Sequence, residues 1–406
     1  MNIAILTNEY PPNVYGGAGV HVEYLTRELA KLDDGAHRIH VFCFGEQRVQ
    51  QGNLTVHGVE AGVDIPAQDP RHTRFLDTMA RDLQMAGRVA EADVVHCHTW
   101  YSHFAGCLVK QLAGSKLVLT THSLEPHRPW KVEQLGTAYH ASSWIEKTAY
   151  QNADGVVAVS RAMRQDVHDL YGVPFERIQI IPNGIDPDEY RPTPAPEVLR
   201  QYDIDPETPY VLFVGRITRQ KGILHLVRAI RHLEPGVQVV LAAGAPDTEE
   251  IAREMTALVE EARAEGQHRI VWIPKMMPRE HIIPLYSHAA VFVCPSVYEP
   301  FGIINLEAMA CETPVVASAV GGIPEIVVPG ETGLLVELEA RGATDFEPKD
   351  PERFSRDLAT AVNRLLGDAA LRERMGTAAR RRVLERFSWA SVARQTLAFY
   401  QRLVAG

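Results

Sequence analysis

Short runs of β-branched and apolar residues alternate with longer helical patterns along most of the chain. These runs lie at residues 3–6, 39–44, 94–97, 117–121, 156–159, 211–214, 237–242, 270–273, 291–294 and 315–317. Such alternation is typical of parallel sheets whose strands are joined by helices. The first helical pattern has apolar residues at 22, 25, 29 and 32, which fall on one face at 3.6 residues per turn. We therefore expect an α/β protein.

The number of expected strands is too large for a single sheet of ordinary size. The alternation is interrupted near the middle of the 406 residues, where residues 182–209 are rich in Pro, Asp and Glu. We predict two Rossmann-like, doubly wound domains at residues 1–185 and 206–387, with an interdomain cleft. Ligands of open parallel sheets bind beyond the carboxyl ends of the strands, so functional residues should follow strands directly.

Charge and apolar content exclude several classes of protein. The net charge of −10 argues against a surface that binds nucleic acid or anionic membranes. No stretch has the 18 or more apolar residues of a membrane span, and the amino terminus lacks the pattern of a signal peptide, so we expect a cytoplasmic protein. The 5 cysteines form no CxxC pair, which predicts buried thiols rather than disulfides or a zinc site.

A glycine-rich loop follows the first expected strand, with Gly16 and Gly17 at its centre. Glycines allow the backbone to approach a ligand, and the N–H groups of a following helix favour phosphate. The dinucleotide fingerprint GxGxxG is not met, because His21 and Val22 stand where a third small residue is needed. A tight turn without any ligand is the alternative interpretation.

The second half opens with FVGRITRQKG at residues 213–222, a strand followed by a basic turn. This is not a P-loop, because Gln220 stands where that motif needs Gly, and Gly222 where it needs Ser or Thr. Arg216 and Lys221 are still suited to holding a diphosphate, Arg through paired donors and Lys as a compact charge. A solvated basic loop is the alternative.

The most specific stretch is CPSVYEPFGIINLEAMA at residues 294–310. It leaves a strand, turns through Pro300 and Gly302, and enters a helix. Glu299 in the loop and Glu307 on the helix can accept hydrogen bonds from vicinal hydroxyls of a sugar or ribose. Because Glu307 has apolar neighbours, we expect its carboxylate to have a partner.

Histidines follow two strands of the first half, in HCHTW at residues 96–100 and THS at residues 121–123. We place His96 and His98 on opposite faces of their strand, where they make a poor metal pair. His98 or His122 can instead bind a sugar hydroxyl, although a structural histidine is the alternative. The next segment, HRPWK, brings Arg128 and Lys131 near the same strand end, which suits an anionic ligand.

Together these motifs resemble the retaining glycosyltransferases of the GT-B fold, in the group that makes glycogen or maltose 1-phosphate. The resemblance rests on TNEYPPNVYGGAGVH, HCHTWYSHFAG, THSLEPHRPWK, IPNGID, FVGRITRQKG and VCPSVYEPFGIINLEAMAC, and it covers essentially the whole chain. It implies that the last helix, residues 388–406, returns to the first domain. It also implies transfer of glucose from ADP-glucose with retention, the departing phosphate accepting the acceptor's proton, with no metal or other cofactor required.

The resemblance implies roles for individual residues. Catalytic roles fall to His122, Arg216, Lys221 and Glu299. The donor would be bound by Gly16, Gly17, Arg216, Lys221, Glu299, Phe301, Gly302, Ile303, Ile304 and Glu307, and we add Lys275 and Met276 as candidates for the base pocket. The acceptor would be bound by Arg74, His98, Thr99, Arg128 and Lys131.

Two departures from the glycogen synthase pattern lie on the acceptor side. Val14 stands where that group has Lys, and Thr99 where it has Asp. Since the donor motifs are kept, we expect glucose 1-phosphate as the acceptor and maltose 1-phosphate as the product. A glycogen synthase that extends an α-glucan and a non-catalytic binding protein are the alternatives. The side chains do not distinguish ADP from UDP, and a homodimer is expected only from its general frequency.

Overall fold

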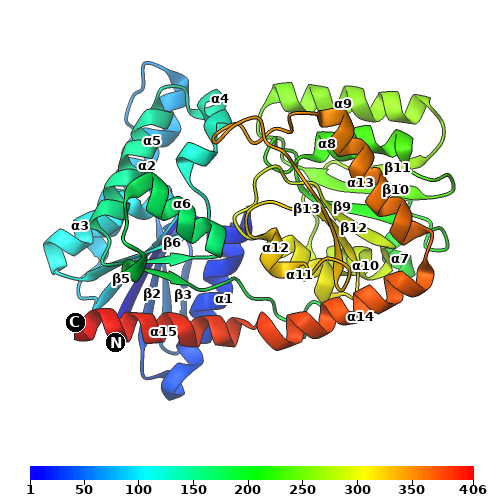
Figure 1. Ribbon diagram of the computed structural model, residues 1–406. Coiled ribbons are helices and arrows are strands. Elements are labelled where there is room, and N and C mark those ends of the chain that lie inside the picture. Colours follow the sequence, from blue (N-terminus) through cyan, green and yellow to red (C-terminus); the bar gives the residue numbers. More distant parts are fainter. The chain divides into compact units, whose positions relative to one another are not determined.

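The computed structural model describes all residues from 1 to 406 and divides into two units (Figure 1). Unit 1 comprises Met1–Gly184 with Trp389–Gly406, and unit 2 comprises Ile185–Ser388. The carboxyl-terminal helix therefore belongs to unit 1, as the resemblance implied. No helix is both long and apolar enough to cross a membrane. All 5 cysteines are free thiols, and only Cys107 is not fully buried.

Residues 186–205, which lie between the two predicted domain ranges, belong to unit 2. Their Pro and acidic content limits regular structure to the short helix α7 (Pro196–Arg200). Tyr190, Leu199 and Ile204 are nevertheless buried. The N–H of Thr193 also donates to Ser287 Oγ at 3.0 Å. Composition signalled an irregular segment, while a few apolar side chains fix it to unit 2.

Unit 1 contains an eight-stranded sheet in the order β3-β4-β2-β1-β5-β6-β7-β8. The sheet is parallel except at its edge, where β3 pairs with β4 antiparallel. Its strands are β1 Asn2–Thr7, β2 Arg38–Phe44, β3 Arg48–Gln51, β4 Leu54–Val59, β5 Val94–His98, β6 Lys116–Thr121, β7 Gly155–Ala158 and β8 Ile178–Ile180. Five of them were predicted. The polar edge strand β3 and the strands β4 and β8 were missed.

Unit 2 contains a six-stranded sheet in the order β11-β10-β9-β12-β13-β14, in which every pairing is parallel. Its strands are β9 Tyr210–Arg216, β10 Gln238–Gly244, β11 Arg269–Ile273, β12 Val291–Cys294, β13 Val315–Ser318 and β14 Gly333–Val336. All were predicted except the short β14. In both sheets the chain adds strands outward from a central strand in two directions, which confirms two doubly wound, Rossmann-like domains.

Helices cover both sheets. Those of unit 1 are α1 Gly17–Lys31, α2 Thr73–Arg88, α3 His103–Ala113, α4 Val132–Leu135, α5 Ala138–Asn152, α6 Arg161–Tyr171 and α15 Trp389–Ala405. Those of unit 2, besides α7, are α8 Ile223–Ala229, α9 Glu249–Ala264, α10 Arg279–His288, α11 Ile303–Ala310, α12 Ile323–Ile326, α13 Pro351–Leu366 and α14 Ala369–Arg386.

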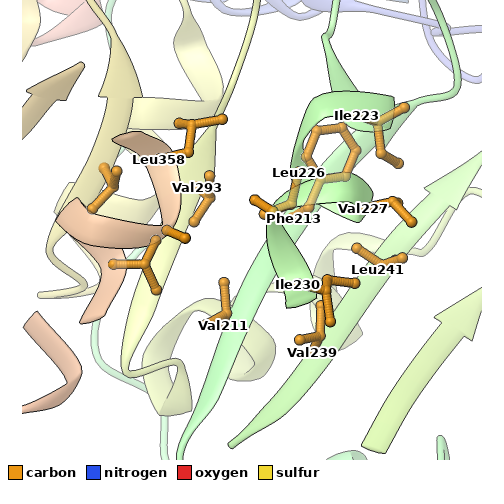
Figure 2. Close-up of a cluster of buried hydrophobic side chains, with 14 of the residues drawn as sticks. Val211, Phe213, Ile223, Leu226, Val227, Ile230, Val239, Leu241, Val293 and Leu358 are labelled. Carbon is orange, nitrogen blue, oxygen red and sulfur yellow. The ribbon is translucent and has the colours of Figure 1, made fainter. Parts of the chain in front are cut away.

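Each unit has its own apolar core. Figure 2 shows that of unit 2, where side chains of α8 and α13 pack on the central strands, Leu226 and Leu358 among them. In unit 1 the predicted apolar face of α1 is fully buried at Val22, Leu25 and Leu29. Helix α15 packs on α1 and adds Tyr400, fully buried, to the same core. A fully buried large apolar side chain contributes roughly 1.5–3 kcal/mol, so α15 is firmly held.

The helices that follow the predicted motifs begin differently from several of the other helices. Helices α6, α9, α13 and α14 begin after a Ser, Thr or Asp whose side chain accepts a backbone N–H three residues on. Helices α1, α8 and α11 instead follow Gly16, Gly222 and Gly302, which supply no side-chain cap. The first N–H groups of these three helices therefore donate no hydrogen bond to a side chain of the preceding residue.

Candidate functional site

In unit 2 the chain reverses its direction of strand addition between β9 and β12. Loops that leave neighbouring strands at such a point run apart and leave room for a ligand beyond the strand ends. Strand β9 ends at Arg216, and β12 ends at Cys294, directly before the loop that contains Glu299. The two most specific predicted motifs of unit 2 therefore share one sheet edge.

The turn after β9 is built around Gly222. Its φ of +61° is left-handed, and a Cβ there would lie 1.9 Å from the carbonyl oxygen of Pro295. The N–H of Val297 donates to the carbonyl of Gln220 at 3.0 Å, which joins this turn to the loop after β12. Only glycine fits such a close approach in this conformation. The contact holds the neighbouring Lys221 beside the Glu299 loop.

Lys221 and Glu299 form an ion pair, with Nζ and Oε2 2.6 Å apart. The Glu299 carboxylate is 8% exposed and also accepts a hydrogen bond from Ser296 Oγ at 3.2 Å. The N–H of Gly322 donates to the Glu299 carbonyl at 3.0 Å, which fixes the loop to the segment after β13. Both residues were predicted for this site, and the structure brings them into contact.

Arg216 lies at the end of β9 with its guanidinium partly exposed, and it pairs with Asp247 at 3.0 Å. Neither predicted cation of the turn is therefore a solitary charge. A guanidinium carries five N–H donors and an ammonium three, so one carboxylate leaves donors for phosphate oxygens. The loop from Phe301 to Ile304 then enters α11 through Gly302, whose φ of +103° is left-handed.

Glu307 has the partner that its apolar neighbours predicted. Tyr286 donates its hydroxyl to Glu307 Oε2 at 2.8 Å, and Tyr190 makes a second side-chain hydrogen bond. Burial raises the pKa of the Glu307 carboxyl above its usual value, although both tyrosines oppose that shift.

The two base-pocket candidates, Lys275 and Met276, follow β11 and are exposed. The Lys275 ammonium lies 5.3 Å from the ring centre of Tyr202, and the Met276 side chain is 56% exposed. The structure thus places them on the surface of unit 2, beyond the edge strand.

Unit 1 has its own switch point, between β1 and β5. The glycine loop follows β1, and the exposed Gly16 and Gly17 are the N-cap and the first residue of α1. The Glu9 carboxylate accepts the N–H groups of Tyr15 at 2.8 Å and Gly16 at 3.0 Å. These two loop N–H groups, which precede α1, are therefore already bound by a carboxylate of the same loop.

His98 ends β5 and is fully buried, and its Nδ1 lies 2.9 Å from Nε2 of His122, which follows β6. The prediction that His96 and His98 face opposite ways is wrong. Their ring centroids are 4.3 Å apart, because residues two apart in a strand share a face. His96 binds Tyr400 and Thr120, so it is a structural histidine. Burial lowers the pKa of all three imidazoles well below the usual value.

Thr99, the next predicted acceptor residue, has a φ of +68°, which is rare outside glycine. Its hydroxyl donates to Asn8 Oδ1 at 2.9 Å. This contact joins the ends of β5 and β1 directly at the switch point.

The three predicted acceptor cations gather in one place, but they are not equivalent. The guanidinium carbon of Arg74 lies 5.6 Å from the ring centroid of Tyr101, and the ammonium nitrogen of Lys131 lies 5.5 Å from it. Lys131 is only 4% exposed and pairs with Glu125 at 3.2 Å, while Arg128 lies 4.0 Å from the same carboxylate. Lys131 is thus a buried, paired ammonium, because an unpaired buried ammonium would be too costly. Arg74 is exposed and Arg128 partly so.

The sequence patterns did not identify the partners of these side chains. Asp247 and Tyr286 lie outside the quoted motifs, and Glu9 lies inside TNEYPPNVYGGAGVH without a spacing that points to its role. Asn183 could have been singled out from the sequence, because it lies in the IPNGID segment on which the family resemblance partly rests. Its Oδ1 lies 2.6 Å from Nδ1 of His21, a buried residue of the glycine-loop motif.

Comparison with known proteins agrees with this arrangement. The family described as Glycosyltransferase Family 4 matches residues 15–189, and the family described as Glycosyl transferases group 1 matches residues 195–382. The chain is 46% identical over 413 residues to the α-maltose-1-phosphate synthase of Mycolicibacterium smegmatis, with 100% of both chains covered. It is 29% identical to a glycogen synthase of Mycobacterium tuberculosis, covering 98% of this chain and 94% of that one.

Among solved structures, the sucrose-phosphate synthase of Thermosynechococcus elongatus superposes with a TM-score of 0.78 at 27% identity, covering 100% of this chain and 99% of that one. The fold, the motifs and the full-length relatives all agree. The chain therefore belongs to the GT-B glycosyltransferases, with a family 4 amino-terminal half and a group 1 carboxyl-terminal half, and is a hexosyltransferase.

Proposed function

We propose that this enzyme transfers glucose, with retention, from ADP-glucose to α-glucose 1-phosphate and so forms α-maltose 1-phosphate. The observation that carries the proposal is the contrast between two relatives. Identity is 46% to a protein named for this synthesis, over the full length of both chains, and 29% to one named glycogen synthase. A difference of this size between two relatives that each match at least 94% of both chains favours the disaccharide phosphate over glucan extension.

The donor side of the proposal rests on the groups at the β9/β12 edge. When the bond between glucose and the diphosphate breaks, negative charge grows on the phosphate oxygens and positive charge on the sugar ring. Lys221 and Arg216 are already oriented by Glu299 and Asp247, and each keeps further N–H donors for the departing phosphate. Fixed donors of this kind lower a barrier because they need no reorganisation as the charge develops. The uncapped start of α11 adds positive potential.

On the acceptor side, the proposal assigns the phosphate of glucose 1-phosphate to Arg128 and Arg74. The Arg74 side chain is exposed and that of Arg128 is 15% exposed, and a guanidinium binds phosphate through two parallel N–H donors. Lys131 acts as a positioning residue: it neutralises the buried Glu125, which otherwise repels an incoming phosphate.

The experiment that tests the proposal measures ADP release from ADP-glucose with glucose 1-phosphate or glycogen as parallel acceptors. The products are separated by mass. We expect a disaccharide phosphate to form much faster than glycogen is extended. Glycogen extension without disaccharide phosphate contradicts the proposed acceptor, and equal use of UDP-glucose contradicts the proposed donor.

A second experiment tests the acceptor residues with matched arginine variants. Arg128→Ala should raise KM for glucose 1-phosphate at least about tenfold, the loss of one charge-assisted contact. Arg71→Ala is the control, because Arg71 is exposed on the same unit and pairs only with Asp69, at 2.8 Å. Equal KM values in both variants would show that Arg128 does not bind the acceptor.

A further inference from the structure

Three imidazole rings from different elements of unit 1 converge on one point. His21 comes from α1, His98 from the end of β5, and His122 from the residue after β6. The ring centroids are separated by 5.3 Å for His21 and His98, 4.8 Å for His21 and His122, and 5.2 Å for His98 and His122. With nitrogens at about 2.0–2.1 Å from a tetrahedral ion, three imidazole centroids lie about 5 Å apart. The spacing of the rings fits one shared ion.

The hydrogen bonds leave His21 with a nitrogen suited to a cation. Its Nδ1 donates to Asn183 Oδ1 at 2.6 Å, since an amide oxygen can only accept. The proton on Nδ1 leaves a lone pair on Nε2, which is buried and makes no hydrogen bond. A histidine held through its other nitrogen by an oxygen acceptor is the usual arrangement of a metal ligand.

His98 and His122 supply the other two nitrogens. Nδ1 of His98 and Nε2 of His122 lie 2.9 Å apart, so they share one proton. Two nitrogens bound to one tetrahedral ion are about 3.3 Å apart, and a cation in place of that proton needs little movement of either ring. The candidate ligand atoms of all three rings lie within 4.8 Å of one another. Since the His98 and His122 nitrogens are already 2.9 Å apart, the His21 ring must move farthest to bind the same ion.

The chemistry of the three ligands selects the ion. Three nitrogens without a carboxylate favour Zn²⁺ over Mg²⁺ or Ca²⁺, which bind oxygen. His122 is the one residue of the three that is not fully buried.

We propose that His21, His98 and His122 bind Zn²⁺ with three protein nitrogens and one open coordination position. Occupancy inhibits sugar transfer, because it engages His122 and closes the β1/β5 switch point to the sugar. The inhibition rests on the proposed function, whereas the binding does not.

Titration of the purified full-length chain with Co²⁺ tests the binding. We expect the intense visible absorption of tetrahedral Co²⁺, one ion per chain, abolished by stoichiometric Zn²⁺. His21→Gln should weaken Co²⁺ binding at least about 100-fold, and Asn183→Ala about 10–100-fold through loss of the oriented Nδ1. His57→Gln is the matched control, because it removes a partly buried histidine that pairs with His40 at 3.3 Å elsewhere in unit 1.

Absence of the tetrahedral spectrum overturns the proposal, as does a spectrum lost in His57→Gln but kept in His21→Gln. Thermal unfolding verifies that each variant is folded; if His21→Gln is not, His122→Gln replaces it, since that ring is partly exposed. In the activity assay, micromolar Zn²⁺ should inhibit the wild type, and a chelator should restore turnover. Zn²⁺ binding without inhibition overturns the second half of the proposal alone.

Discussion

Gly222→Ala tests whether the contact between the turn after β9 and the loop after β12 holds the donor site together. At φ +61° an alanine costs roughly 1–2 kcal/mol for the left-handed backbone alone. Its Cβ would also lie 1.9 Å from the Pro295 oxygen, 1.1 Å inside the 3.0 Å limit of real contacts. Relieving that overlap costs typically about 1–3 kcal/mol and breaks the hydrogen bond between Val297 and Gln220, worth about 1 kcal/mol. The sum is about 3–6 kcal/mol.

Gly236→Ala is the control for the backbone term. Gly236 also has a left-handed φ, +88°, but no atom lies within 4 Å of its added Cβ. It should therefore lose only about 1–2 kcal/mol. For a unit of this size, 1 kcal/mol shifts Tm by about 2–4 °C, so Gly222→Ala should lower the Tm of unit 2 by at least about 4 °C more than the control.

Differential scanning calorimetry of the full chain measures both shifts, and ADP release at saturating substrates measures the effect on the site. We expect Gly222→Ala to lose most of its turnover below its Tm, since Lys221 moves with the turn, and Gly236→Ala to keep it. Equal shifts of Tm in the two variants would refute the steric reasoning.

Three further predictions concern buried or paired charges. Lys221→Met keeps an unbranched chain but removes the cation, and ADP release should fall by about 10²–10³-fold; near-normal turnover would contradict its role at the diphosphate. Lys131→Met leaves Glu125 buried without its cation and should cost about 3–5 kcal/mol in chemical denaturation. The double variant with Glu125→Gln should recover most of that loss, and no recovery would refute the pairing. Burial raises the pKa of Glu146 from 4.5 to about 8, so the folded chain keeps a proton that the unfolded chain has lost. The free energy of unfolding should therefore decline as pH rises from about 4.5 to 8, and Glu146→Gln should flatten that decline by up to about 1.4 kcal/mol per pH unit. An unchanged pH profile in the variant would contradict this.

Ten of the fourteen strands were predictable because buried parallel strands are nearly continuous apolar runs. The runs at residues 3–6 and 211–214 mark the central strands β1 and β9. Strand β3 was not predictable in this way, since all four of its residues are exposed at an edge of the sheet. That residues 186–205 belong to unit 2 was not predictable either, because isolated buried residues in an irregular stretch have no period.

Site residues were predictable where they stand at strand ends, because the fold places such positions at one edge of the sheet. Arg216 and Glu299 were found in this way. Their partners were not, because a hydrogen bond between distant segments leaves no local pattern. Asp247 lies 31 residues beyond Arg216, and Asn183 lies 162 residues beyond His21. The error over His96 and His98 had another origin. Residues two apart in a strand lie on the same face of the sheet, whereas the prediction placed these two on opposite faces.

Both proposed diphosphate-binding cations of unit 2 are held by a carboxylate, Arg216 by Asp247 and Lys221 by Glu299. A cation that is partly buried loses hydration, and its attraction to a paired carboxylate offsets the resulting cost in free energy. The pairing also fixes a long side chain before any ligand binds, which removes an entropic cost of about 0.5–1.5 kcal/mol per side chain from binding. Under the proposed function, a phosphate would therefore meet ordered donors, although the net charge around them is low. Affinity at such a site depends on the direction of the N–H donors more than on net charge, so substrate binding should weaken less with added salt than it would beside exposed, unpaired lysines.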